Sequence, residues 1–236
     1  MKRDFQARFC GKVEVRLPCV TRLLITKLII VIMYLDMRLF IWLFLSFICA
    51  TVIGTLSHEL GHYVVAEFLG YDADFHYGAT GIVKGPVNGK PSDGFWITSG
   101  GPIQTMLTGS IGLLLILIYR KSFSLSIALS GWQWFLVFIA LFWLRQTANL
   151  WTWIGGYLLR GNFSGRGDEI LLAKYLGLSN WLILTFTGLI GWTVLTIITF
   201  KVVPVKQRLT FLVSGLLGGI VGYILWLDVL GKVIIS

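Results

Sequence analysis

The sequence predicts an all-α membrane protein that crosses the bilayer several times, and three observations support this fold class. Hydrophobic residues make up 56% of the 236 residues and charged residues only 13%, whereas soluble chains carry about 25% charged residues. The mean hydropathy is +0.80. The hydrophobic residues also gather in long runs, which short and mostly basic loops separate. These features exclude an ordinary soluble domain.

Five apolar runs approach the length of about 20 residues that a helix needs to cross the hydrocarbon layer. They cover residues 39–69, 95–119, 127–144, 181–200 and 209–230. The first run contains no helix breaker before Gly70, and glycine accepts the left-handed conformation that ends many helices. A further run at 23–35 is short and is interrupted by Lys27, so it is either an interfacial helix or an extra span. We therefore expect about five transmembrane helices, or six if residues 23–35 also cross.

The distribution of charge predicts the orientation. Residues 1–38 carry eight basic and three acidic side chains, while the loop at 71–94 carries two basic and three acidic ones. Cytoplasmic segments of membrane proteins are enriched in Lys and Arg. We therefore expect a basic cytoplasmic segment at 1–37 and a single membrane-embedded domain at 38–236. In this topology Arg145, which follows the third run, belongs to a loop that faces outward.

The net charge of +9 does not indicate a nucleic-acid partner. The basic residues lie in the N-terminal segment and in short loops, where contact with lipid headgroups accounts for them, and no recognition motif accompanies them. The largest loop, at 71–94, is too short for an inserted nucleotide-binding domain. Its Gly-rich part, "YGATGIVKGPVNGKPSDG", can form a hairpin or a loop that dips into the membrane, or it is a plain connector. The lipid bilayer, and not a nucleic acid, is therefore the expected partner of the basic segments.

The three cysteines, Cys10, Cys19 and Cys49, contain no CxxC pair. An odd number without such a pair predicts neither a disulfide framework nor a cysteine zinc site.

A metal-binding motif lies in the first apolar run, in the stretch "TLSHELGHYVVAEFLGY". Residues four apart on a helix share a face, so His58 and His62 can present their imidazoles to one metal ion. Glu59 is rotated by about 100° from His58, where it can reach a water bound to the metal rather than the metal itself. This is the pattern of a zinc hydrolase in which Glu59 is the base. Gly61 leaves one side of the helix bare, so a partner helix or substrate strand can approach closely.

An alternative interpretation is that these histidines only form hydrogen bonds with a neighbouring span, with Glu59 as a partner. The chain has three histidines in all, and two of them fall at the ligand spacing with a glutamate after the first. Ionisable groups at membrane depth are also costly, so a functional role is the default. The metal site is therefore the favoured interpretation.

A catalytic zinc ion needs a third protein ligand, with water in the fourth position. The long zincin pattern requires histidine at position 68, which is Phe68 here, and Glu67 points about 140° away from His62 on the same helix. Three candidates remain open. Asp168 and Glu169 follow the flexible "GNFSGRG" and start a helical pattern, where acids are also favoured by the helix dipole. His76 begins the Gly-rich loop and is either a ligand, a residue that lines the site, or a surface residue.

These motifs resemble those of the site-2 protease family of intramembrane zinc metalloproteases. The resemblance rests on the membrane-embedded "HELGH", on "SGGPIQTMLTG" at the start of a later span, and on the acidic pair before a helical segment, and it covers about residues 50–175. It implies that residues 38–236 are a metalloprotease-like domain. It further implies that His58 and His62 bind zinc, that Glu59 is the general base, and that Asp168 matches the family's aspartate ligand.

The sequence departs from the family pattern in two places. Gln104 and Thr105 follow Gly101-Pro102 where the family usually has an asparagine, and "GRGDEI" lacks the proline and the Asp-Gly-Gly that usually surround the third ligand. Asn149 is a candidate for the missing amide. Beside the ligands and the base, we expect the following residues to line the site: Gly101, Pro102, Asn149 and His76.

The function expected from the sequence is that of an endopeptidase with one zinc ion, which hydrolyses peptide bonds of membrane-embedded proteins or peptides by means of metal-activated water. The alternative is a non-proteolytic zinc-binding membrane protein, either a pseudoprotease or a regulator that holds partner helices. A transporter is disfavoured because the apolar runs show no inverted repeat. The expected location is a bacterial cytoplasmic membrane, which the chain crosses several times. No nucleotide cofactor is expected.

Overall fold

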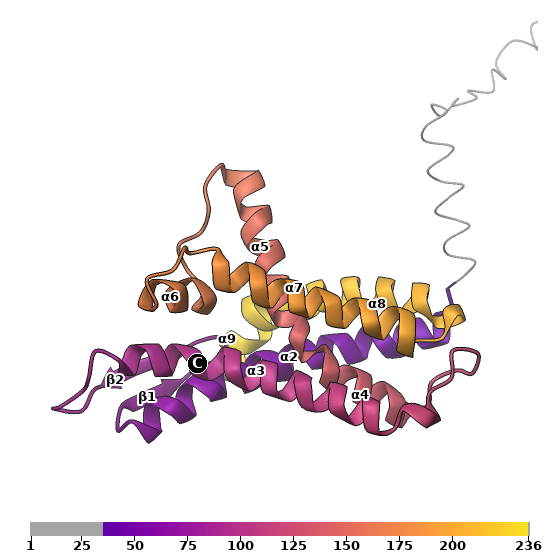
Figure 1. The fold of residues 1–236 in the computed structure, drawn as a ribbon, viewed down its shortest axis with the longest axis horizontal. Coiled ribbons are helices and arrows are strands. Elements are labelled where there is room, and N and C mark those ends of the chain that lie inside the picture. Colours follow the sequence, from indigo (N-terminus) through magenta and orange to yellow (C-terminus); the bar gives the residue numbers. More distant parts are fainter. Residues whose placement is uncertain (1–34, 236) are drawn as a thin grey trace, which may run out of the picture. The chain divides into compact units, whose positions relative to one another are not determined.

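The computed structural model describes residues 35–235, so the predicted segment at 1–37 and the apolar run at 23–35 fall almost entirely outside the described residues. From Asp36 onward the chain forms one compact unit. This unit consists mostly of helices, with one two-stranded sheet (Figure 1). The prediction of a helical fold is confirmed, and the sheet is an addition to the predicted all-α class.

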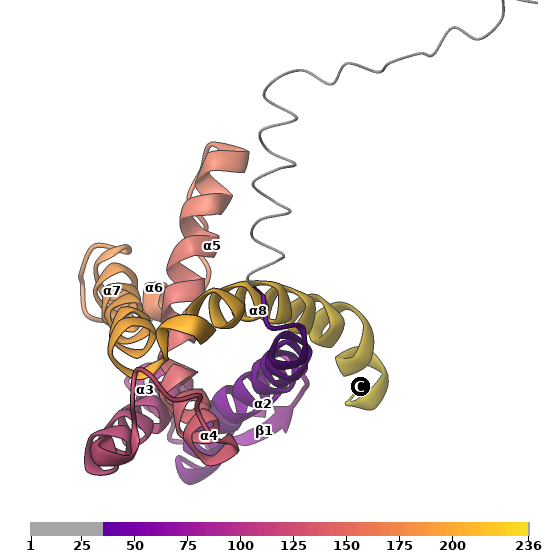
Figure 2. The ribbon, with the colours of Figure 1, turned by 90° about the vertical axis from the view of Figure 1, so that its right-hand side faces the viewer.

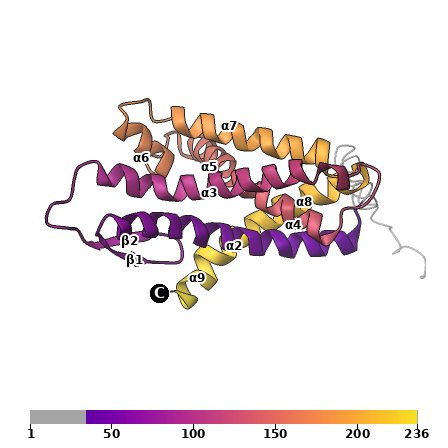
Figure 3. The same ribbon diagram turned by 60° about the horizontal axis from the view of Figure 1, so that its bottom comes forward.

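Within residues 35–235, four helices are long and apolar enough to cross a membrane, which indicates a membrane-embedded, multi-pass protein. Two of them, α7 and α8, continue into π-helical turns. Three of the four, α2, α3 and α7, run roughly parallel (Figures 1 and 3). The elements of these spans are α2 (Met37–Phe68), α3 (Asp93–Ile118), α7 (Leu182–Ile197) with η3 (Ile198–Val202), and α8 (Val205–Ile224) with η4 (Leu225–Leu230) and α9 (Gly231–Ile234).

The third apolar run, predicted as a span at 127–144, does not form a helix of spanning length. It is divided into α4 (Gly131–Ala140), the 3-10 turn η2 (Leu141–Trp143) and the start of α5 (Leu144–Arg160). The ten residues of α4 extend only about 15 Å, half the thickness of the hydrocarbon layer. The chain changes direction at η2, and α5 projects away from the long helices (Figures 1 and 2). A short 3-10 turn, η1 (Arg120–Ser122), precedes α4.

The loop after α2 forms a hairpin of β1 (Asp72–Phe75) and β2 (Thr80–Lys84), which pair antiparallel. As predicted, Gly70 ends the first helix, because it adopts a φ of +81° just after Phe68. The turn of the hairpin is held by the indole of Trp226, which donates a hydrogen bond of 2.8 Å to the carbonyl oxygen of Tyr77. The hydroxyl of Thr80 donates to the carbonyl oxygen of Glu59 at 2.8 Å, so the hairpin is joined directly to the HELGH segment.

Close backbone contacts fix α2 between α3 and α8. A Cβ atom on Gly61 would lie 2.5 Å from the carbonyl oxygen of Gly100, and one on Gly218 would lie 2.6 Å from that of Phe44. The expectation that Gly61 lets a partner helix approach is thus confirmed, and the partner is α3. The largest apolar cluster brings Phe47 of α2 together with residues of α4, η3 and α8.

Candidate metal centre

The HELGH segment lies near the C-terminal end of α2, with both histidines buried. His58 is 0% exposed and His62 8%, and their Nε2 atoms are 3.2 Å apart. Asp168, the first residue of α6 (Asp168–Tyr175), directs Oδ2 to the same point, 2.9 Å from Nε2 of His58 and 3.5 Å from Nε2 of His62. The three ligand atoms all lie within 4.8 Å of one another, so this group can hold a metal ion.

The position of Asp168 depends on how α6 is anchored. Gly161 ends α5 in the left-handed conformation, and Gly167, at a φ of +124°, turns the chain into α6. On α6, Ile170 is 2% exposed and packs in a cluster with Leu184 of α7. Tyr175 packs edge-on against Phe95 of α3, with ring centroids 6.2 Å apart. These contacts tie a short helix from a distant part of the sequence to the start of α3.

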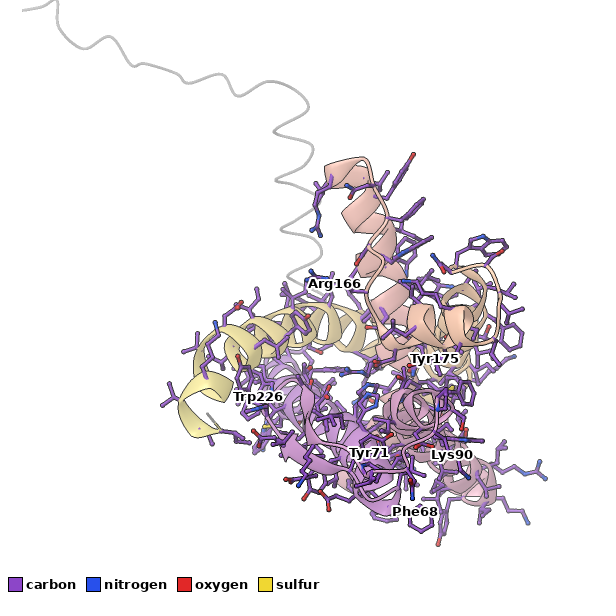
Figure 4. The ribbon with its side chains drawn as sticks, turned by 90° about the vertical axis from the view of Figure 1, so that its left-hand side faces the viewer. Phe68, Tyr71, Lys90, Arg166, Tyr175 and Trp226 are labelled. Atoms are coloured by element: carbon purple, nitrogen blue, oxygen red, sulfur yellow. The ribbon has the colours of Figure 1, made fainter. Side chains whose placement is uncertain are left out.

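Figure 4 looks at this end of the molecule with its side chains drawn. Tyr175 of α6 and Arg166 of the preceding loop lie on one side, and Phe68, the last residue of α2, lies on the other with Tyr71, which follows the helix. The hydroxyl of Tyr71 donates to a carboxylate oxygen of Asp93 at 3.0 Å. The three ligand atoms therefore lie at the end of the molecule where the β1–β2 hairpin, the start of α3 and the helix α6 meet.

Hydrogen bonds behind the ligands favour one ring nitrogen of each histidine as the carrier of the hydrogen. Nδ1 of His62 lies 2.7 Å from the carbonyl oxygen of Ile97, which can only accept. Nδ1 of His58 lies 2.9 Å from the hydroxyl of Thr105, which itself donates to the carbonyl oxygen of Gly101 at 2.9 Å. The backbone N–H of Gly101 also lies 3.3 Å from Nδ1 of His62, but the contact with Ile97 is shorter. With Nδ1 as the donor on both rings, both Nε2 atoms present lone pairs to the centre.

The donor set fits a divalent metal ion. Two imidazole nitrogens and a carboxylate oxygen are all acceptors, and acceptors 2.9–3.5 Å apart repel one another unless a cation lies among them. Ligands of a tetrahedral zinc ion, each about 2.0–2.1 Å from the metal, are about 3.3 Å apart. The observed separations lie close to this value.

Gly101 leaves the space in which the ligands meet. A Cβ atom there would lie 2.4 Å from Nε2 of His62 and 2.6 Å from Nε2 of His58. Gly101, which was expected to line the site, therefore lies beside both ligand nitrogens, and Pro102 follows it, buried within α3. Thr105, which holds His58, was not among the predicted site residues. It lies one helical turn after Gly101, and this spacing was the available signal.

Glu59 is buried but stands apart from the ligand group. Its side chain is 8% exposed, and Oε1 lies 3.7 Å from Nη2 of Arg145 on α5. Arg145 was expected in an outward-facing loop, and that expectation is wrong because the chain bends at η2. The bend carries the first turn of α5 to the HELGH helix. No pattern in the sequence predicts this contact, because it depends on tertiary packing.

The other predicted site residues lie elsewhere. Glu169 is 1% exposed and accepts hydrogen bonds of 3.1 and 3.3 Å from the side-chain amide of Asn149. Burial raises the pKa of the Glu169 carboxyl. His76 pairs with Asp74 at 3.0 Å and its side chain is 42% exposed. Among the described residues, neither Glu169 nor His76 belongs to the group around His58, and Asn149 reaches that group only through the helix that carries Asp168.

Comparison with known proteins adds nothing to this geometry, since no family model, no curated protein and no solved structure matches the chain. The function is therefore argued from the residues of the site alone.

Proposed function

We propose that the chain is a zinc-dependent intramembrane endopeptidase that resembles the site-2 protease family. The observation that carries the proposal is the convergence of His58, His62 and Asp168, from two helices more than a hundred residues apart. Glu59 follows His58 in the chain and is also buried. Two histidines and a carboxylate that leave a coordination position open are the ligand set of several zinc hydrolases. A purely structural role for these side chains would not call for three acceptor atoms directed at one point.

Each residue has a distinct part in the proposed reaction. His58, His62 and Asp168 hold the ion, and Thr105 and the carbonyl oxygen of Ile97 keep the imidazoles oriented. Bound zinc supplies Lewis acidity, which lowers the pKa of a water to about 7 and polarises a carbonyl group. Glu59 accepts the proton of the attacking water and passes it to the leaving amine.

The position of the site along α2 supports access by water. His58 is 21 residues after Met37, which corresponds to about 32 Å along the helix axis, whereas the hydrocarbon layer is about 30 Å thick. The catalytic centre then lies near the interface at the far end of α2, where water and a peptide bond can meet. A substrate that is a membrane protein or a membrane-bound peptide would bring its scissile bond to this level.

The finer topology and location belong to the same proposal. The membrane is a bacterial cytoplasmic membrane, and the basic N-terminal segment lies on its cytoplasmic side. The four described helices each cross the membrane, and residues 23–35 add one more span if they also cross it.

The test is cleavage by Glu59→Gln beside Glu67→Gln, a matched change on the same helix. The purified variants are incubated in detergent with fluorescein-labelled casein and with single-span membrane proteins. Loss of the base should lower cleavage by at least about 100-fold, with bound zinc unchanged, because Glu59 is not a ligand. Glu67→Gln should cleave like the wild type. Full cleavage by Glu59→Gln would refute the mechanism, and zinc binding without cleavage by the wild type would favour a pseudoprotease.

A further inference from the structure

Arg145 lies in the first turn of α5 and is the cation next to Glu59. Its side chain is 27% exposed, and Nη2 is 3.7 Å from Oε1 of Glu59. A guanidinium docked on a carboxylate normally makes contacts of about 2.7–2.9 Å, often two in parallel. The longer distance means that Arg145 is close to the base without being bound to it.

The donors of Arg145 have no acceptor in the part of the chain that the structure describes. Within residues 35–235 its five N–H groups make no hydrogen bond, and Nε is buried without a partner. Arg208 on α8 offers a contrast, since it donates from Nε to the carbonyl oxygen of Val203 at 3.1 Å and from Nη2 to that of Phe200 at 2.9 Å. Buried donors without acceptors are costly. A guanidinium in this state is suited to an acceptor that arrives with the substrate.

We propose that Arg145 is a catalytic residue that donates hydrogen bonds to the oxygen of the scissile carbonyl as that oxygen becomes negative. This inference rests on the proposed peptidase function and deepens it. Donors that face a developing oxyanion stabilise it more than they stabilise the neutral carbonyl, so they lower the barrier rather than only strengthening substrate binding. Arginine suits this part because it keeps its proton throughout.

The step balances without a further reactant. The oxygen of water forms a bond with the carbonyl carbon, Glu59 takes the proton that water loses, and the π electron pair of the carbonyl moves onto its oxygen, where Arg145 donates its hydrogen bonds. The pair then returns to re-form the carbonyl, the carbon–nitrogen bond breaks, and the leaving nitrogen takes the proton from Glu59. Arg145 is unchanged at the end.

A double-mutant cycle separates direct contact from an effect through Glu59. The probe is a phosphinic peptide, whose anionic tetrahedral group mimics the oxyanion. Its dissociation constant for zinc-loaded protein is measured by calorimetry in detergent for the wild type, Arg145→Met, Glu59→Gln and the double variant. Arg145→Lys keeps the charge, and Arg160→Met is the control for losing a cation from the same helix.

We expect Arg145→Met to weaken phosphinate binding by about 100-fold, both alone and in the Glu59→Gln background. Its kcat on labelled casein should fall by a similar factor with KM nearly unchanged, Arg145→Lys should recover part of both losses, and Arg160→Met should match the wild type. If Arg145→Met had no effect on binding in the Glu59→Gln background, or if it lost zinc while Arg145→Lys kept it, the assignment would be wrong. Failure of the proposed peptidase function would show differently, as tight phosphinate binding by a wild-type protein that cleaves nothing.

Discussion

At the scale of single residues, the candidate centre depends on groups that do not themselves bind the metal. Thr105 and the carbonyl oxygen of Ile97 each hold an Nδ1 atom, and Gly101 leaves the gap that the two Nε2 atoms face. Such supporting groups fix the tautomer and orientation of histidine ligands. A substitution that removes a hydrogen bond to an imidazole should therefore weaken zinc binding more than one that leaves the imidazoles untouched.

Thr105→Val should weaken zinc binding by about 10–100-fold, because the His58 imidazole loses its hydrogen-bond partner while the side-chain volume is kept. Thr108→Val, one turn further along α3, is the matched control, since Thr108 bonds to Gln104 and not to a histidine. Competition with a chromophoric chelator measures both affinities. Equal affinities for the two variants would contradict the part given to Thr105.

Gly101→Ala should abolish zinc binding, because the added methyl group would lie 2.4 and 2.6 Å from the two ligand nitrogens. Gly219→Ala is the control, since a Cβ atom at that helical position meets nothing within 4 Å. Both proteins should remain folded by circular dichroism. Normal zinc content in Gly101→Ala would show that the ion does not sit between these nitrogens.

At the scale of elements, the short helix α6 brings the third ligand to the centre. Its docking comes from Ile170, which is 2% exposed, and from the contact of Tyr175 with Phe95. Asp168 and Glu169 are adjacent, so they point about 100° apart on the helix. The orientation of α6 therefore decides which of the two carboxyl groups reaches the histidines.

Ile170→Ala should lower zinc affinity by at least about 10-fold without changing a ligand, because a cavity beneath α6 costs about 2–5 kcal/mol of packing free energy. Leu171→Ala is the neighbouring control, since Leu171 is 40% exposed. Zinc titration of both variants checks this. A larger loss in Leu171→Ala than in Ile170→Ala would contradict the described docking of α6.

The sequence predicted those elements that depend on local patterns. Four of the five apolar runs became helices of spanning length, and Gly70 ended the first one. The run at 127–144 was predicted wrongly because hydropathy does not reveal the bend at η2. The same bend brings Arg145 to Glu59, so this contact could not be predicted from the sequence either. The choice between Asp168 and Glu169 required the tertiary contacts of α6, which no spacing in the sequence encodes.

At the scale of the whole molecule, the metal position links elements that are far apart in the sequence. The ligands come from α2, which is fixed by glycine contacts to α3 and α8, and from α6, which packs on α3 and α7. A ligand that binds only the folded state stabilises it by mass action. Zinc should therefore stabilise the bundle as a whole and not only the site.

Removal of zinc by a chelator should lower the free energy of unfolding by about 3 kcal/mol relative to protein kept at a free zinc concentration 100 times the dissociation constant. Thermal unfolding in detergent, followed by circular dichroism, measures the effect. In Asp168→Ala the unfolding temperature should no longer respond to zinc. A response equal to that of the wild type would mean that the stabilising ion binds elsewhere.

The most direct test of the metal centre is the zinc content of the detergent-purified protein, measured by elemental analysis for the wild type and single alanine variants. The wild type and His76→Ala should each hold about one zinc ion per chain, and His58→Ala, His62→Ala and Asp168→Ala less than about a tenth of that. Full zinc content in Asp168→Ala, together with its loss in His76→Ala or Glu169→Ala, would contradict the centre described here.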